Sequence, residues 1–122
     1  MIVVAVIALL GAVVLPAYQS QIRKAHRADA KASLTTAAQM MERYITEKST
    51  YATATLGSGG VFADRSENGY YALALTDLSA ATFTLTAAPQ GSQASDPCGT
   101  YTLNQAGARG VTGGSLSAAE CW

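Results

Sequence analysis

The first 18 residues constrain this chain more than any other feature. They read MIVVAVIALLGAVVLPAY, a stretch without a charged side chain or a side-chain amide. A helix of this length extends for about 27 Å, close to the thickness of the hydrocarbon core of a bilayer. Leaving its ten large aliphatic side chains in water would cost on the order of 20 kcal/mol, which exceeds the stability of a typical small domain. We therefore expect the segment to contact lipid, other helices, or both.

A cleaved secretory signal is the main alternative, and both flanks of the run argue against it. No basic residue precedes the run, and no small-x-small cleavage site closes it. The chain continues instead into IRKAHRADAKASLTTAAQMMERYITEKSTY, which lacks Gly and Pro and is rich in good helix formers. In this second half the apolar stripe has helical spacing and consists of Ala30, Leu34, Ala37, Met41, Tyr44 and Ile45, with Lys48 at its end.

These patterns predict one long helix over about residues 1–48. Its first half is apolar all round, and its second half is amphipathic. We expect the helix to be loosened near Gly11–Pro16, since proline removes a backbone hydrogen bond and clashes with the preceding turn. Pro16 fits either a stretch that unwinds and extends or a simple kink. Small residues in the run, Ala5, Ala8 and Ala12 together with Gly11, would let neighbouring helices approach closely.

The composition changes after Tyr51, where a connecting loop rich in Gly, Ser and Thr begins. Alternating patterns then predict strands at 70–76, 81–88 and 99–105, and a short fourth strand around Val111. The fold class is therefore α+β, with a long helix first and a short antiparallel sheet of three or four strands second. The expected units are a hydrophobic helix at 1–22 and a head at 23–122, which divides into helix 23–48, loop 49–69 and sheet region 70–122.

Two cysteines, Cys98 and Cys121, lie in the last quarter of the chain. Their spacing matches no metal motif and the chain has one histidine, so neither a metal nor a cofactor is expected. We predict a disulfide, which would stabilise the domain by about 3 kcal/mol and would place it in an oxidising compartment. Two buried free thiols are the alternative.

Charge limits the range of functions. Eight basic and eight acidic residues give a formal net charge of +0, which argues against a globally basic nucleic-acid binder. Four basic residues nevertheless cluster after the apolar run, and they suit contacts with lipid headgroups, contacts with acidic groups of a neighbouring subunit, or a solvated face: Arg23, Lys24, Arg27 and Lys31. DNA binding is weakly supported, because no aromatic residues are interleaved with them. No catalytic residues are predicted, since His26 lies within this cluster and no serine or threonine has a local base pattern.

Three stretches carry a family resemblance. MIVVAVIALLGAVVLPAYQSQIRKAHRADA closely resembles the N-terminal region of type IV pilins, and MERYITEKSTYA and DPCGTYTLNQAGARG, with the terminal CW, resemble type IVa-like minor pilins of the PilE type. In that family a Phe-Thr-Leu-Ile-Glu-Leu stretch precedes such a sequence, so we expect Met1 to be an internal residue of the mature subunit. The resemblance implies a pilin fold, a leader removed by a prepilin peptidase, N-methylation, and the inner-membrane assembly machinery as a partner.

The resemblance also implies a function. The chain would be a structural subunit of a surface pilus, held in the inner membrane with a periplasmic head before it enters a helical filament, alone or with other pilins. Such filaments support adhesion, twitching motility or DNA uptake. The residues expected to pack in the filament core are Met1, Ile2, Val3, Val4, Val6, Ile7, Leu9, Leu10, Val13, Val14 and Leu15. A type II secretion pseudopilin and a membrane-anchored periplasmic binding module that never polymerises are the alternatives.

Overall fold

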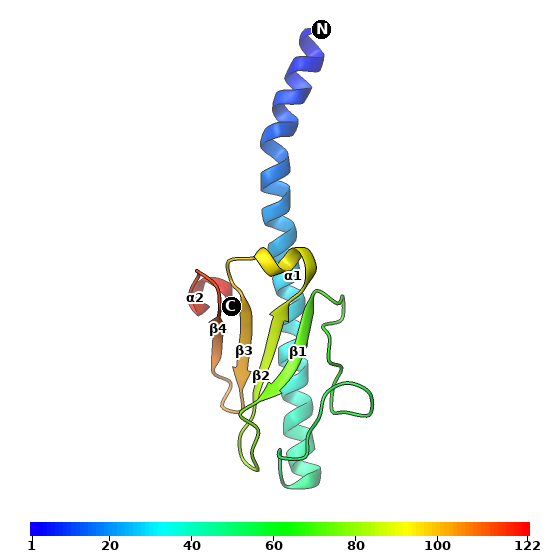
Figure 1. Cartoon of the computed structure of the whole chain (residues 1–122), viewed down its shortest axis with the longest axis vertical. Helices are drawn as coiled ribbons and strands as arrows, with labels where there is room; N and C mark the ends of the chain where they lie inside the picture. Colours follow the sequence, from blue (N-terminus) through cyan, green and yellow to red (C-terminus); the bar gives the residue numbers. More distant parts are fainter.

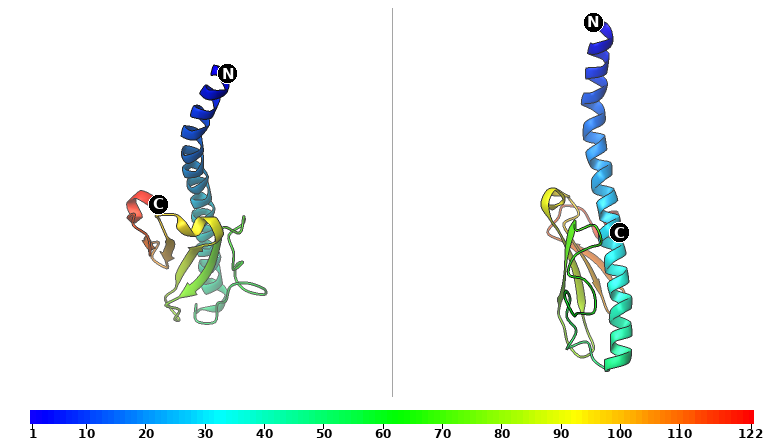
Figure 2. Two further views of the ribbon diagram at one scale, coloured as in Figure 1. Left: turned by 45° about the horizontal axis from the view of Figure 1, so that its top comes forward. Right: turned by 90° about the vertical axis from the view of Figure 1, so that its right-hand side faces the viewer.

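A computed structural model describes the backbone of residues 1–122 and the side chains of residues 1–12, 18 and 20–122. One long helix, α1 (Ile2–Lys48), runs the length of the molecule, and a four-stranded sheet packs against its second half (Figures 1 and 2). The first half of α1 extends alone beyond the sheet. The predicted long helix is confirmed within one residue at its start. Its backbone is helical without interruption over 11–16, so the loosening expected near Gly11–Pro16 is not seen. Ser49, which has a left-handed φ of 63°, ends it by donating its N–H to the Ile45 carbonyl.

The sheet is an antiparallel meander whose spatial order follows the chain. Its strands are β1 (Tyr71–Thr76), β2 (Thr84–Pro89), β3 (Thr100–Asn104) and β4 (Arg109–Thr112). Leu75 pairs with Leu85, and Leu85 with Leu103, so apolar side chains line up on the face toward α1. The prediction of three or four antiparallel strands and the α+β class are confirmed, and the sheet has four.

The core lies between this inner sheet face and the apolar stripe of α1. The stripe residues Ala30, Leu34, Ala37 and Met41 are fully buried, as the helical spacing predicts. Tyr44 and Ile45 are partly buried against the core. From the sheet side come the largest buried side chains, Tyr71, Phe83, Leu85 and Tyr101. Lys48 is exposed at the end of the stripe.

Three features differ from the sequence-based expectation. β2 begins at Thr84 rather than at residue 81, because Thr82 closes a turn by donating its hydroxyl to the Asp77 carbonyl and its N–H to Ser79 Oγ. A 3-10 helix, η1 (Gly91–Ser95), and a single helical turn, α2 (Ala118–Cys121), were not predicted. Elements of one turn are too short to show a hydrophobic period.

The loop between α1 and β1 lies along the opposite edge of the sheet from β4 (Figure 1). Asp29 of α1 holds it through Oδ1, which accepts from the backbone N–H and the side-chain amide of Asn68, each at 3.3 Å. Gly60 is required at its tight turn, since a Cβ there would lie 2.4 Å from the Thr55 carbonyl oxygen. The loop is thus tied to the helix and not only to its own neighbours.

We call residues 1–22 the stalk and residues 23–122 the head. All buried apolar side chains of the described residues are at Ala30 or later. A chain of residues 23–122 should therefore be a soluble monomer with its sheet and disulfide intact, since the stalk contributes nothing to the described core. Circular dichroism and light scattering would test this. Unfolding or aggregation of the shortened chain would show that the division into stalk and head is wrong.

Candidate functional site

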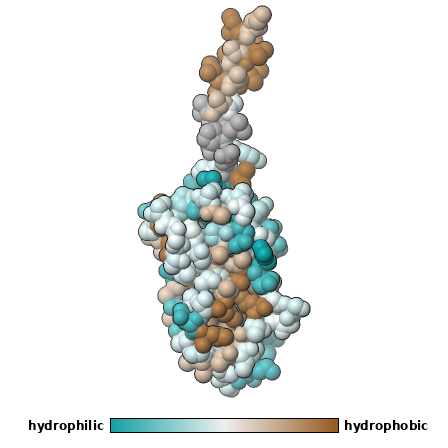
Figure 3. All heavy atoms as spheres, in the orientation of Figure 1, coloured by the Kyte–Doolittle hydropathy of each residue, from teal (hydrophilic) through white to brown (hydrophobic). Residues whose placement is uncertain are grey.

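The stalk presents an uncovered apolar surface. Eight large hydrophobic side chains among residues 1–10 are each at least 47% exposed, and the brown end of the molecule in Figure 3 is this surface. At roughly 2 kcal/mol for each side chain, their exposure to water is costly. The predicted core residues Val13, Val14 and Leu15, together with Pro16 of the predicted loosened segment, lie outside the described side chains. Among the described residues, no helix combines the length and the hydropathy of a membrane span.

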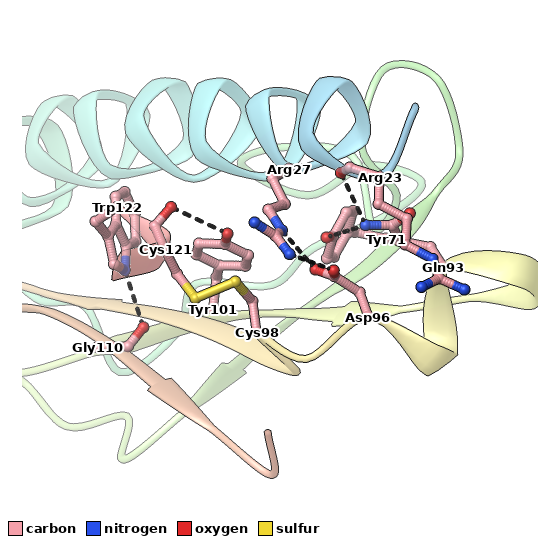
Figure 4. The surroundings of a disulfide bond; sticks show 10 residues. All are labelled: Arg23, Arg27, Tyr71, Gln93, Asp96, Cys98, Tyr101, Gly110, Cys121 and Trp122. Atoms are coloured by element: carbon pink, nitrogen blue, oxygen red, sulfur yellow. Dashed lines mark hydrogen bonds and ion pairs between the residues drawn. A yellow bond between two sulfur atoms is a disulfide. The ribbon is translucent and has the colours of Figure 1, made fainter. Parts of the chain in front are cut away.

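Arg27 and Asp96 form a bidentate ion pair where the head begins (Figure 4). Arg27 Nε lies 2.8 Å from Asp96 Oδ2, and the side chain of Asp96 is fully buried. The hydrogen bond to Asp96 raises the pKa of Arg27, which keeps the pair charged. Of the four basic residues predicted to contact headgroups or neighbouring subunits, Arg27 is thus engaged within its own chain. We expect such contacts only from Arg23, Lys24 and Lys31.

Gln93 of η1 lies beside this pair and is almost fully buried. Its amide nitrogen donates to the Arg23 carbonyl at 3.2 Å and to the Tyr71 hydroxyl at 3.0 Å. Its amide oxygen lies 3.1 Å from His26 Nδ1, so this nitrogen is the one that carries the proton. The His26 ring also stacks on Tyr70, with ring centroids 3.5 Å apart. These contacts fix η1 to α1 at the point where the stalk leaves the head.

A recess opens between α1 and η1 at this end of the head. Its lining residues are Ile22, Arg23, His26, Ser92, Gln93 and Ser95. Arg23 Nη2 donates to the hydroxyl of Ser95 at 3.2 Å. Arg23 forms no ion pair with any described residue, so its charge is uncompensated there.

A second recess lies on the other side of α1, beside β4. Its lining residues are Lys31, Ala32, Thr35, Thr36, Arg109 and Trp122. The Arg109 guanidinium lies 5.2 Å from the centroid of the Trp122 ring, and the indole N–H donates to the Gly110 carbonyl. Neither Lys31 nor Arg109 pairs with a carboxylate of the described residues. Two cations and an aromatic ring therefore share one hollow.

The disulfide Cys98–Cys121 closes the C-terminal segment onto the sheet, as predicted. Both cysteines are buried, and the Tyr101 hydroxyl donates to the Cys121 carbonyl at 3.1 Å (Figure 4). In the chain-entropy model a loop of this size contributes about 3 kcal/mol. The disulfide also holds the adjacent Trp122 against β4, so it supports one wall of the second recess.

Sequence reasoning missed the polar residues that organise the first recess. Asp96 and Gln93 stand in a stretch that reads as a polar connection, and no local pattern distinguishes a buried carboxylate from a solvated one. The surplus of basic residues after the stalk was the only available signal, because a buried cation needs a partner. His26, which was not assigned a catalytic role, contacts Gln93 and Tyr70. No group of three metal-ligating side chains occurs among the described residues.

Comparisons with known proteins converge on one family. Residues 16–102 match the model of the family described as type IV minor pilin ComP, DNA uptake sequence receptor. The non-core minor pilin PilV of Neisseria meningitidis superposes with a TM-score of 0.65 at 27% identity, covering 81% of this chain and 95% of that one. A type IV pilin of Shewanella oneidensis superposes with a TM-score of 0.59 at 29% identity, covering 82% of this chain and 97% of that one. No curated protein sequence matches the chain.

Replacing Arg27 by methionine should lower the free energy of unfolding by about 3–5 kcal/mol, since it leaves the Asp96 carboxylate buried and unpaired. Arg43→Met is the matched control, because Arg43 forms an exposed pair with Glu47 at 3.4 Å and should cost less than about 1 kcal/mol. Urea unfolding monitored by circular dichroism measures both. Equal losses in the two variants would contradict the assigned role of the buried pair.

Alkaline pH should destabilise the head. Burial raises the pKa of Tyr71 and that of Tyr101 above the ordinary value near 10. The unfolded chain ionises these phenols first, so their stabilising contribution is complete below about pH 10 and is lost as the pH rises further. Urea unfolding at pH 8 and pH 11, with absorbance at 295 nm to follow ionisation, tests this. If Tyr101→Phe shows the same alkaline loss as the unmodified chain, Tyr101 is not a source of it.

Proposed function

Because the chain belongs to the type IV minor pilin ComP family, we propose that it is a pilus subunit that assembles through its N-terminal hydrophobic helix. Its family and fold are structural, and the chain is a type IV pilin rather than an enzyme. The observation that carries the assembly proposal is the exposed apolar surface of the stalk. That surface protrudes from an otherwise complete head, so copies of the stalk can cover one another in a bundle.

The geometry of the stalk suits a filament that grows without limit. A protruding helix can contact one neighbouring subunit through one face and a second subunit through another face. Such a heterologous interface, when it does not close into a ring, produces an open helical filament. Small residues at Ala5, Ala8, Gly11 and Ala12 permit close helix approach. Loosening near Gly11–Pro16 would let the stalk lengthen during packing. We infer that residues 50–122 face outward.

Before assembly, we propose that the stalk lies in the inner membrane with the head in the periplasm. A helix of residues 1–22 is about 33 Å long, close to the hydrocarbon thickness of about 30 Å. The disulfide supports an oxidising compartment for the head. A prepilin peptidase, N-methylation and inner-membrane assembly proteins belong to this proposal through the family.

Two alternatives predict different material at the cell surface. A type II secretion pseudopilin shares the N-terminal helix, and a membrane-anchored binding module would never polymerise. The matched family and the two structures described above are type IV pilins, which supports the pilus. Electron microscopy of sheared surface material, with an antibody to the head, separates the pilus from a module that stays in the membrane.

A charge in the stalk should abolish assembly. Val6→Asp places a carboxylate in an apolar bundle or bilayer, where its burial costs several kcal/mol, and sheared filaments should fall below detection. Val6→Leu is the matched control and should assemble normally, since it preserves the apolar surface. Immunoblots of the sheared and membrane fractions measure both variants. Normal filaments containing the Val6→Asp subunit would refute the central role of this helix.

We propose DNA uptake as the second functional candidate for the assembled subunit. The family description names a DNA uptake sequence receptor, and the second recess brings Lys31 and Arg109 together with Trp122. Cations that contact the phosphate backbone are the usual elements of duplex DNA binding. A formal net charge of +0 means that any attraction must come from this local cluster.

Trp122 is the only tryptophan, so its fluorescence reports on the recess directly. Duplex DNA should quench it, with an affinity that falls as salt rises. Replacing Lys31 or Arg109 by glutamine should weaken binding several-fold, measured by anisotropy of labelled duplex at fixed salt. Lys48→Gln is the control, since it also removes one positive charge but lies at the C-terminal end of α1 and does not line the recess. Equal losses in all three variants would indicate diffuse attraction and not a site.

A further inference from the structure

The recess between α1 and η1 has a volume of about 370 Å³. The helix η1 lies beside α1 where the stalk leaves the head (Figure 1). Its lining combines an apolar side chain, Ile22, with an arginine, a histidine, two serines and a glutamine. Hydrophilic residues gather at this end of the head, directly below the hydrophobic stalk (Figure 3). The proposed function leaves this recess without a role.

Arg23 gives the recess a positive charge that can bind an anion. No acidic side chain of the described residues lines it, and the nearby Asp96 is paired with Arg27. Among the described residues, the Arg23 side chain makes one hydrogen bond, to the hydroxyl of Ser95. A guanidinium carries five N–H donors in a planar fork that matches two oxygens of a phosphate. Arg23 therefore retains donors for an anion.

The walls of the recess are held in place before any ligand arrives. Gln93 is fixed by bonds to the Arg23 carbonyl, the Tyr71 hydroxyl and His26 Nδ1. The His26 ring is fixed by its stack on Tyr70, and its Nε2 has no hydrogen-bond partner among the described residues. Rigid walls reduce the ordering cost of binding. The hydroxyl of Ser92 forms no side-chain hydrogen bond in the described part of the chain and adds a further donor.

We propose that this recess binds the phosphate of a phospholipid headgroup, a role that rests on the membrane stage of the proposed function. With residues 1–22 across the hydrocarbon core, Arg23 and the recess lie at the level of the headgroups. Ile22 on the wall offers an apolar surface to the glycerol and upper acyl atoms. This position favours a lipid over DNA, because a duplex would have to reach the end of the head that faces the bilayer.

The test uses the full chain in phosphate-free maltoside micelles. The probes are dihexanoyl-phosphatidylglycerol, the matching diacylglycerol without phosphate, inorganic phosphate, and a short DNA duplex. His26 is the only histidine, so its ring resonances report on the recess directly. Phosphatidylglycerol should shift them saturably, whereas the diacylglycerol should not.

Three variants assign the effect to the recess. Arg23→Gln should weaken phosphatidylglycerol binding about tenfold or more, the usual loss for a charge-assisted hydrogen bond. Ser92→Ala, which removes only a hydroxyl, should weaken it to a smaller extent. Lys48→Gln is the matched control, since it removes one positive charge from an exposed residue at the C-terminal end of α1 that does not line the recess. Thermal unfolding would confirm that each variant is folded.

Four results would overturn the inference. The first two are no saturable shift of the His26 resonances, and equal losses for Arg23→Gln and Lys48→Gln. The other two are inorganic phosphate binding as tightly as the lipid, and Arg23-dependent DNA binding that is tighter than lipid binding. Failure here would not affect the filament proposal, because short-chain lipids reach the recess whether or not the stalk spans a membrane. Normal filament yield from Arg23→Gln together with absent lipid binding would separate the two.

Discussion

The packing of the α1 stripe against the inner face of the sheet is the interaction on which the head depends. Ala30, Leu34, Ala37 and Met41 are fully buried there, and the sheet has no other apolar layer to cover it among the described residues. The same helix continues into a segment with no such cover. One helix therefore has a half that is uncovered by the rest of the chain and a half that packs against the sheet, and the boundary lies within a few residues of Ile22.

Polar contacts mark that change. Arg27 and Asp96 are removed from water as a pair, and such a pair is strongly destabilising only when one partner is lost. Together with the buried Gln93 they fix η1 against α1. The direction in which the stalk leaves the head is thus set by side chains with strict geometric requirements, which suits a subunit whose stalk must enter a bundle at a defined angle.

The two edges of the sheet are secured in different ways. At β4 the disulfide, the Tyr101 hydroxyl and the Trp122 indole hold the C-terminal segment. At β1 the connecting loop is held to α1 by Asp29 and Asn68. Each edge is therefore partly covered, which limits strand-to-strand association between heads. This arrangement agrees with the proposed assembly through the stalk.

The sequence by itself determined the long helix, its buried stripe, the four strands and the disulfide. The helix, the stripe and the strands follow from periodicity, which is a local property of the sequence. The disulfide follows from the presence of two cysteines, which allow one pairing. Only the tertiary structure decided which basic residues remain available. Arg27 and Asp96 are 69 positions apart, and Gln93 reaches the Arg23 carbonyl across 70. No local pattern shows that a carboxylate in a polar connection will be buried, because its burial depends on where η1 lies against α1.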